Sequence, residues 1–218
     1  FGHDYHMDID ERYRLKVRNP ITTGFARFDE ITQGGFGESE LGVVIAPTGA
    51  GKSMALVHLG STAVKEKKTV IYYTLELAET VVGQRFDSCI TGIKLNDLLR
   101  NKLNVVKQLK QVGGHLIIKE YPSKSASTQT IRSHIERLKK RGINPDMVIV
   151  DYADLLKPVK SQGEKRHELE SIYEELRGIA QREKCTVITA SQTNRGGLNA
   201  EVITMESISE AFSKCFVA

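Results

Sequence analysis

Five short stretches of nearly unbroken apolar residues recur along the chain, and longer stretches of mixed polarity separate them. The five stretches cover residues 41–46, 69–74, 115–120, 146–151 and 185–191. Apolar runs of this length, without alternating polar positions, are typical of strands that are buried on both faces of a parallel sheet. The hydrophobic pattern therefore predicts five buried strands.

Between the strands, apolar residues recur at helical spacing. One helix is predicted to be capped by Ser127 or Thr128 and stopped by Gly142. The apolar faces of two such helices consist of Ile131, Ile135 and Leu138 in the first, and of Leu169, Ile172, Leu176 and Ile179 in the second. We interpret both faces as core. Alternating strands and helices predict an α/β fold, in which helices cover both faces of a mostly parallel sheet and ligands bind at the carboxyl ends of the strands.

The chain shows no internal repeat and no second apolar pattern that indicates another domain. We expect a linker or edge segment over residues 1–20 and a single core over residues 21–218 that is truncated at its C-terminal end. With 40% hydrophobic and 27% charged residues, the composition is globular. The net charge of +4 is compatible with nucleic acid but does not establish it. Three scattered cysteines suggest neither a disulfide framework nor a zinc site, and no membrane-spanning run or signal peptide is recognisable. We expect a cytoplasmic protein without a membrane partner.

The stretch VVIAPTGAGKSMAL, residues 43–56, resembles a phosphate-binding loop with one letter changed. A predicted strand, a glycine-rich turn and a helical segment follow one another in the order that a P-loop requires. Ala46 stands where the standard pattern has its first glycine, at the strand exit, where a methyl group is tolerable. The predicted ATP-binding residues are Ala46, Pro47, Thr48, Gly49, Ala50, Gly51, Lys52 and Ser53.

The residue types of this loop suit phosphate chemistry. Gly49 and Gly51 supply backbone conformations that side chains disfavour, so that main-chain N–H groups turn inward around phosphate oxygens. Lys52 is long enough to reach the β- and γ-phosphates, and the Ser53 hydroxyl suits the shell of a Mg²⁺ ion. The alternative is a lysine-capped loop without a ligand.

Three polar residues at the ends of other predicted strands extend this site. Asp151 follows four apolar residues and is predicted to serve the Mg²⁺ shell together with Ser53. Glu76 is a candidate base for the attacking water, although it would equally suit the start or the cap of the next helix. Gln192 follows the last strand, where a glutamine can orient the γ-phosphate region; its alternative is a polar loop residue.

Taken together, these segments resemble the RecA-like motor domain of DnaB-type replicative helicases, with details most similar to those of T-even-type phages. The resemblance runs from ITTGFARFDEITQGGF to SISEAFSKCFVA and includes TLELAE, VIVDYADLL, SQTNR and IIKEYPSKSAS. Alanine with a nearby proline is common in the family at the position of Ala46. The resemblance implies that Lys52, Glu76 and Gln192 act in catalysis, and that Arg85 matches a family arginine that supports the site.

What the resemblance implies is an ATP-driven motor that uses Mg²⁺, assembles as a hexamer, and translocates on single-stranded DNA. Primase and a helicase loader are the further partners that it implies. Two loops after buried strands are candidate DNA contacts, because cations track phosphates and glycines allow a close backbone approach. Their residues are Lys157, Lys160, Lys165 and Arg166 in the first loop, and Arg195, Gly196 and Gly197 in the second. For the first loop, the alternative is a solvated charged face.

Other functions share the same core. A recombination or repair ATPase would form open filaments on DNA, and a regulatory ATPase would assemble with proteins and ignore nucleic acid. A small-molecule kinase is disfavoured, because we find no arginine-rich lid segment. The family's N-terminal primase-interacting domain has no counterpart here, and we expect the arginine finger of the ring motor to lie beyond Ala218.

Overall fold

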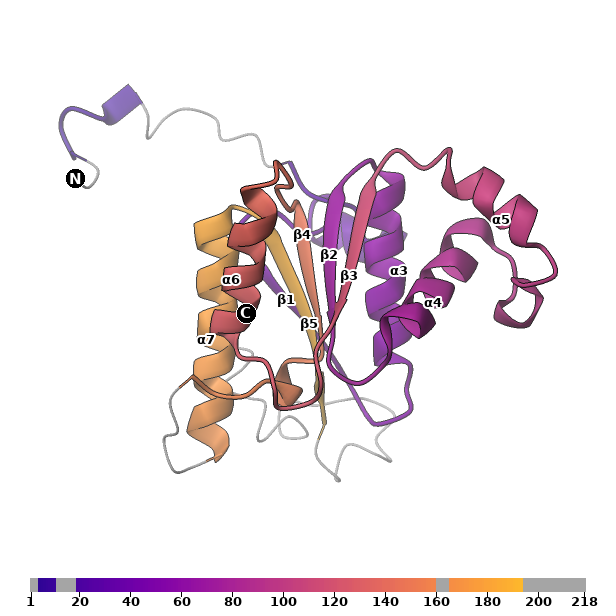
Figure 1. Ribbon diagram of the computed structural model, residues 1–218. Helices are drawn as coiled ribbons and strands as arrows, with labels where there is room; N and C mark the ends of the chain where they lie inside the picture. The colour runs from indigo at the N-terminus through magenta and orange to yellow at the C-terminus, as the bar shows by residue number, and fades with distance from the viewer. Residues whose placement is uncertain (1–3, 11–18, 160–164, 194–218) are drawn as a thin grey trace.

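The five apolar runs form the strands of one parallel sheet (Figure 1). The computed structural model describes residues 4–10, 19–159 and 165–193. The strands lie in the order β1-β5-β4-β2-β3, and every neighbouring pair is parallel. Their bounds are β1 Leu41–Ala46, β2 Thr69–Thr74, β3 His115–Glu120, β4 Met147–Asp151 and β5 Thr186–Gln192. The predicted strands are thus confirmed to within one residue at each end.

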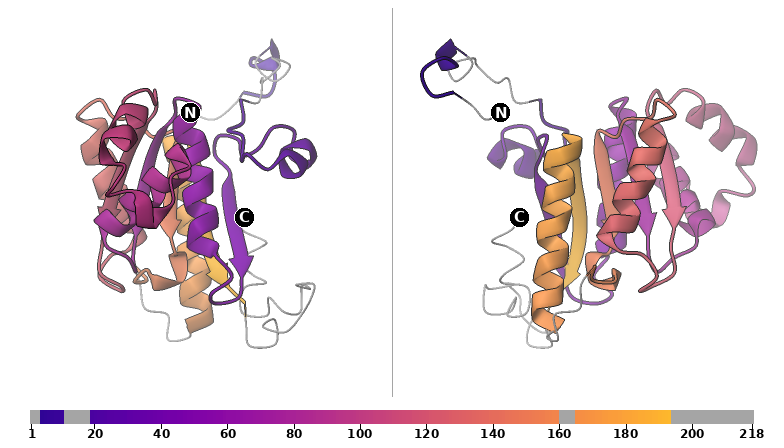
Figure 2. Two further views of the ribbon diagram at one scale, coloured as in Figure 1. Left: turned by 90° about the vertical axis from the view of Figure 1, so that its right-hand side faces the viewer. Right: turned by 60° about the vertical axis from the view of Figure 1, so that its left-hand side comes forward.

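Helices cover both faces of this sheet, as Figures 1 and 2 show. On one face lie α3 (Lys52–Lys65) and α4 (Glu79–Thr91), and on the other lie α6 (Thr128–Lys139) and α7 (Lys165–Glu183). The shorter elements are α2 (Ala26–Ile31), η1 (Leu95–Asp97), α5 (Lys102–Leu109) and η2 (Ala153–Leu155). None of the helices in the described part of the chain is both long and apolar enough to cross a membrane. The α/β prediction is confirmed.

Alternate residues of each strand enter two separate hydrophobic clusters. Ile71 and Tyr73 of β2 pack into the cluster on the side of α6 and α7, whereas Val70 and Tyr72 pack into the cluster on the side of α3 and α4. This division follows from the two-residue side-chain period of a strand. Both predicted helical stripes, in α6 and α7, belong to the first cluster, which confirms that they are core.

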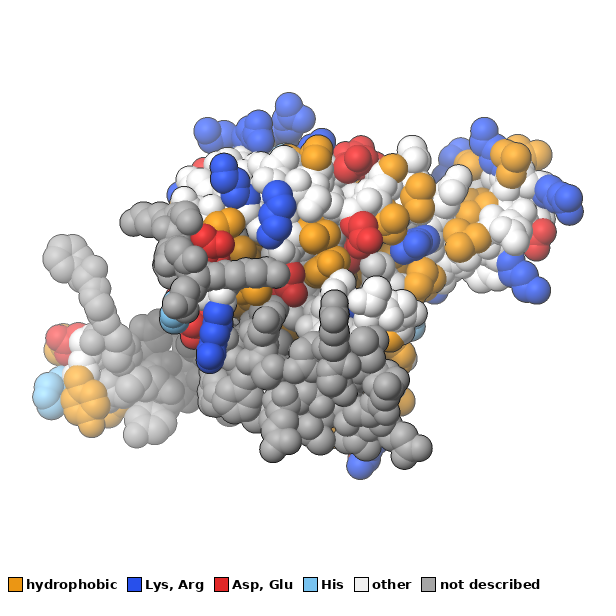
Figure 3. Space-filling model, turned by 90° about the horizontal axis from the view of Figure 1, so that it is seen from below, with side chains coloured by type: hydrophobic (Ala, Val, Ile, Leu, Met, Phe, Trp, Pro, Cys, Tyr) orange, Lys and Arg blue, Asp and Glu red, His pale blue; other side chains and the backbone are white. Residues whose placement is uncertain are grey.

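Parallel pairing brings the carboxyl ends of the strands to one edge of the sheet. Thr74 at the end of β2 pairs with Asp151 at the end of β4. Ala46 at the end of β1 pairs with Gln192 at the end of β5. Residues that are far apart in sequence therefore lie in one row, and the loops that follow them share one end of the molecule. That end faces the viewer in Figure 3.

The start of α6 is held by a capping box. The Ser127 hydroxyl accepts a hydrogen bond from the Thr130 amide at 3.3 Å, and the Thr130 hydroxyl accepts one from the Ser127 amide at 3.2 Å. Each bond satisfies an amide that the helix itself leaves unpaired. Of the two predicted caps, the structure selects Ser127. The turn after the helix closes with Gly142, whose φ of 80° favours glycine.

Replacing Ser127 by alanine removes one half of this capping box. We expect Ser127→Ala to lower the free energy of unfolding by about 1 kcal/mol, measured by urea denaturation. The control is Ser133→Ala in the middle of the same helix, where alanine is a better helix former and stability should hold or rise slightly. Equal losses in the two variants would contradict a capping role for Ser127.

Candidate functional site

A pocket of about 260 Å³ lies at the carboxyl edge of the sheet and collects residues from five parts of the chain. The loop between β1 and α3, with the start of α3, forms one wall, and the segment after β2, helix α4, the residue after β4 and the end of β5 supply the others. Its lining includes Thr48, Gly49, Gly51, Lys52, Ser53, Met54, Glu76, Arg85, Tyr152 and Gln192. The structure thus brings together all four residues that were predicted to be catalytic.

The loop between β1 and α3 has a backbone that only glycine adopts readily. Gly49 has a φ of 81° and Gly51 a φ of 94°. A Cβ atom at either position would meet no atom within 4 Å, so backbone conformation, rather than space in the protein, requires glycine here. Helix α3 begins immediately afterwards at Lys52. Its first amide groups have no partner within the helix and are available to an anion.

Lys52 lies across this loop and is only 9% exposed. Its ammonium group donates hydrogen bonds to the carbonyl oxygens of Ala46, at 3.1 Å, and Pro47, at 2.8 Å. Burial lowers the pKa of Lys52 from its ordinary value, while the carboxylates of Asp151, Glu76 and Asp154 oppose that shift by favouring the charged form. The loop therefore holds a cation beside the ends of β2 and β4.

Asp151 is a nearly buried carboxylate, 2% exposed, at the end of β4. Its oxygens accept hydrogen bonds from the Ser53 hydroxyl at 3.1 Å and the Tyr72 hydroxyl at 2.7 Å. Carboxylate and hydroxyl oxygens are ligands that Mg²⁺ accepts. No cluster of three or more His, Cys, Asp or Glu side chains suited to a metal occurs among the described residues. The donor set therefore fits Mg²⁺ that takes most of its ligands from phosphates and water.

Glu76 is exposed and lies two residues beyond the end of β2. Helix α4 begins at Glu79, with Ala78 at its N-cap position, so Glu76 neither starts nor caps that helix. Its carboxylate instead lines the pocket together with Arg85, which α4 supplies from its second turn. The structure thus contradicts the alternative that Glu76 starts or caps α4, and it places Glu76 at the pocket.

Gln192 is fixed by a neighbour that the sequence did not single out. Its amide donates a hydrogen bond of 2.8 Å to the Tyr152 hydroxyl. Burial raises the pKa of Tyr152, and the carboxylates of Glu76, Asp154 and Asp151 raise it further, which keeps the phenol neutral. Tyr152 directly follows Asp151, and that adjacency is the signal that could have indicated it.

Of the predicted DNA contacts, only part falls within the described residues. Lys157 is exposed, and its amide donates to the Ala126 carbonyl oxygen at 2.8 Å. Lys165 and Arg166 belong to the first turn of α7 rather than to a loop, and Arg166 is exposed. The predicted contacts outside the described residues are Lys160, Arg195, Gly196 and Gly197.

Comparison with known proteins finds a family match over most of the chain. The model of the DnaB-like helicase C-terminal domain matches residues 20–201. The DnaB-like replicative helicase of Enterobacteria phage T4 is 28% identical over 96% of this chain and 47% of its own length. The replicative DNA helicase DnaB of Helicobacter pylori strain 26695 is 25% identical over 80% of this chain and 37% of its own length. The chain thus spans less than half of these two relatives.

Solved structures agree in fold. A solved ATPase domain superposes with a TM-score of 0.78 at 16% identity, covering 96% of this chain and 77% of that one. A DnaB-like replicative helicase, described together with its interactions with primase, superposes with a TM-score of 0.77 at 16% identity, covering 93% of this chain and 50% of that one. At this level of identity the likeness establishes the RecA-like fold alone.

The buried hydrogen bond from Tyr72 to Asp151 can be removed without changing the shape of the ring. We expect Tyr72→Phe to lower the free energy of unfolding by about 1–3 kcal/mol, because it leaves a buried carboxylate oxygen without its donor. The measurement is urea denaturation. Tyr121→Phe is the control, since the partly exposed Tyr121 ring stacks on Tyr73 and needs only its ring to do so. A loss no larger than that of the control would contradict the role of the Tyr72 hydroxyl.

Proposed function

Since the chain belongs to the DnaB-like helicase C-terminal domain family, we propose that it is the ATP-hydrolysing motor domain of a ring-shaped replicative DNA helicase that translocates on single-stranded DNA. The proposal rests on one observation above all: Lys52, Glu76, Arg85 and Gln192 converge on a single pocket beside the phosphate-binding loop. The names of the relatives support the same assignment.

In this proposal the loop residues 46–53 bind the phosphates of ATP. The first amide groups of α3 and the Lys52 ammonium group face the negative charge, and the phosphate oxygens replace the carbonyl oxygens that Lys52 contacts. Ser53 and Asp151 hold the Mg²⁺ ion, which neutralises charge on the phosphate oxygens. Tyr72 keeps the Asp151 carboxylate in place from the other side.

Glu76 acts as the general base of the hydrolysis and takes a proton from the attacking water. Glu76 is exposed and lines the pocket. No hydrogen bond to another described residue has to break before its carboxylate can contact the water. Arg85 lies in the same pocket and provides positive charge that orients Glu76 and the phosphates. Gln192 contacts the γ-phosphate region from the end of β5, three residues before Arg195.

The active form in this proposal is a hexameric ring of this domain. In this ring, the residues of two segments contact the phosphates of single-stranded DNA. They are Lys157, Lys160, Lys165 and Arg166 in the first segment, and Arg195, Gly196 and Gly197 in the second. Primase is a proposed partner, because one of the structural relatives is described in interaction with it. A helicase loader is the other.

The experiment that tests this function is ATP hydrolysis by the full-length protein with and without a single-stranded oligonucleotide. We expect hydrolysis to depend on Mg²⁺, to rise on adding DNA, and to be abolished by Lys52→Ala, which removes the charge that faces the phosphates. Lys65→Ala is the control, because Lys65 is exposed at the opposite end of the same helix. A rate that ignores DNA would favour a regulatory ATPase, and DNA stimulation without displacement of a paired strand would favour a recombination ATPase.

Glu76→Gln should separate binding from hydrolysis. The amide is nearly isosteric but cannot accept the proton of the water, so we expect unchanged ATP affinity and a rate lower by ~10²–10⁴-fold. The matched control is Glu120→Gln, because Glu120 ends the neighbouring strand β3 at the same edge of the sheet. If Glu120→Gln lost the hydrolysis activity and Glu76→Gln kept it, the general base would be Glu120, and the assignment of Glu76 would be wrong.

A further inference from the structure

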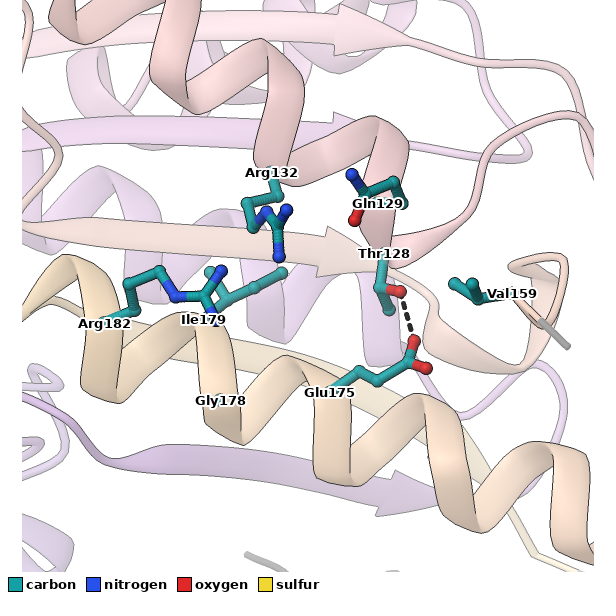
Figure 4. Close-up of a pocket in the computed structure, with 8 residues that line it drawn as sticks. All are labelled: Thr128, Gln129, Arg132, Val159, Glu175, Gly178, Ile179 and Arg182. Carbon is teal, nitrogen blue, oxygen red and sulfur yellow. Dashed lines mark hydrogen bonds between the residues drawn. The ribbon is translucent and has the colours of Figure 1, made fainter.

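A second concave site lies between α6 and α7, and none of its residues lines the pocket of the phosphate-binding loop. It is a groove of about 220 Å³ (Figure 4). Helix α6 supplies Gln129 and Arg132, helix α7 supplies Glu175, Ile179 and Arg182, and Val159 closes one end.

Two guanidinium groups face this groove from opposite helices. Figure 4 shows the side chains of Arg132 and Arg182 directed toward the same stretch of it, above Ile179. The Arg132 Nε atom is buried and makes no hydrogen bond. It lies 3.6 Å from Glu136 Oε1, which is close enough for an ion pair but too far for a hydrogen bond. Arg182 has no carboxylate partner among the described residues.

The other nearby carboxylates already have donors. Glu175 accepts hydrogen bonds from the hydroxyl of Thr128 and, at 3.4 Å, from that of Ser171. Glu183 pairs with Lys139 at 2.8 Å. Two arginines thus face one lining carboxylate, Glu175; Arg132 has Glu136 beside it, whereas Arg182 has no carboxylate partner among the described residues. Arginine pairs of this kind suit a planar anion that can accept hydrogen bonds from both.

The groove also offers apolar contact. Ile179 forms part of its floor, and Val159 is 48% exposed at its rim. Gly178 adds open space, because a Cβ atom there would meet nothing within 4 Å. A groove of this volume has room for one or two side chains of a peptide.

We propose that this groove binds an acidic peptide segment of a partner protein, with one carboxylate between Arg132 and Arg182 and an apolar side chain against Ile179 and Val159. The carboxylate of Glu175 lines the same groove, which disfavours a nucleic-acid strand with its continuous row of phosphates. A single peptide carboxylate can lie between Arg132 and Arg182, at the end of the groove away from Glu175. The groove shares no lining residue with the pocket proposed for ATP.

The test uses a fluorescein-labelled hexapeptide of alternating aspartate and leucine, titrated into the chain and followed by fluorescence anisotropy. The methyl resonance of Ile179 in a ¹³C-labelled sample reports where the peptide binds. We expect saturable binding with a shift of that resonance. Inorganic phosphate and an oligothymidylate of equal charge serve as competitors and should displace the peptide only weakly.

Charge and shape are tested separately. Arg132→Gln and Arg182→Gln should each weaken binding about five- to tenfold, as expected for a partly exposed charge-assisted contact. Arg137→Gln is the matched control: it lies on the same helix, but its Nε atom donates to the Ser133 carbonyl oxygen, and it does not line the groove. Gly178→Leu fills the groove with both arginines retained and should abolish binding.

Three results would overturn the proposal. The first is peptide binding that survives Gly178→Leu, since the peptide would then lie elsewhere. The second is stronger binding of phosphate or oligothymidylate than of the peptide, which would make the groove a phosphate or nucleic-acid site. The third is loss of peptide binding when the chain self-associates, which would place the groove between copies of this chain.

Discussion

The parallel pairing of all five strands is the constraint on which the rest of the structure depends. In a parallel sheet every strand delivers its last residue to the same edge, whatever the distance along the sequence. Ser53 and Asp151 are 98 residues apart, yet their side chains form a hydrogen bond. Ala46 and Gln192 are cross-strand partners for the same reason. The carboxyl edge of the sheet therefore positions the site, and the loops at that edge supply most of its polar side chains and amide groups.

This constraint explains why many residues that line the pocket can be predicted from the sequence. Buried parallel strands are continuous apolar runs, so their ends are visible as the first polar residue after each run. Asp151 and Gln192 are recognisable in that way. The proposed phosphate-binding loop is recognisable from its spacing, because Gly49 and Gly51 take positive φ values that few other residues adopt.

What the sequence could not predict depends on contacts across the sheet or between helices. Tyr72 donates to Asp151 because β2 lies beside β4, and that neighbourhood follows from strand order rather than from local pattern. The role of Tyr152 likewise requires that β5 end beside it. The groove of Arg132 and Arg182 depends on how two helices pack, and in the sequence each arginine alone resembles an ordinary exposed charge.

The division of the interior into two clusters has a consequence for variation in this protein. Tyr72 and Tyr73 are neighbours in sequence, but they belong to opposite sides of the sheet. Substitutions in separate clusters share few partners, and their effects on stability then add. Substitutions in the layer of α6 and α7 are therefore expected to leave unchanged the packing of α3, which directly follows the proposed phosphate-binding loop.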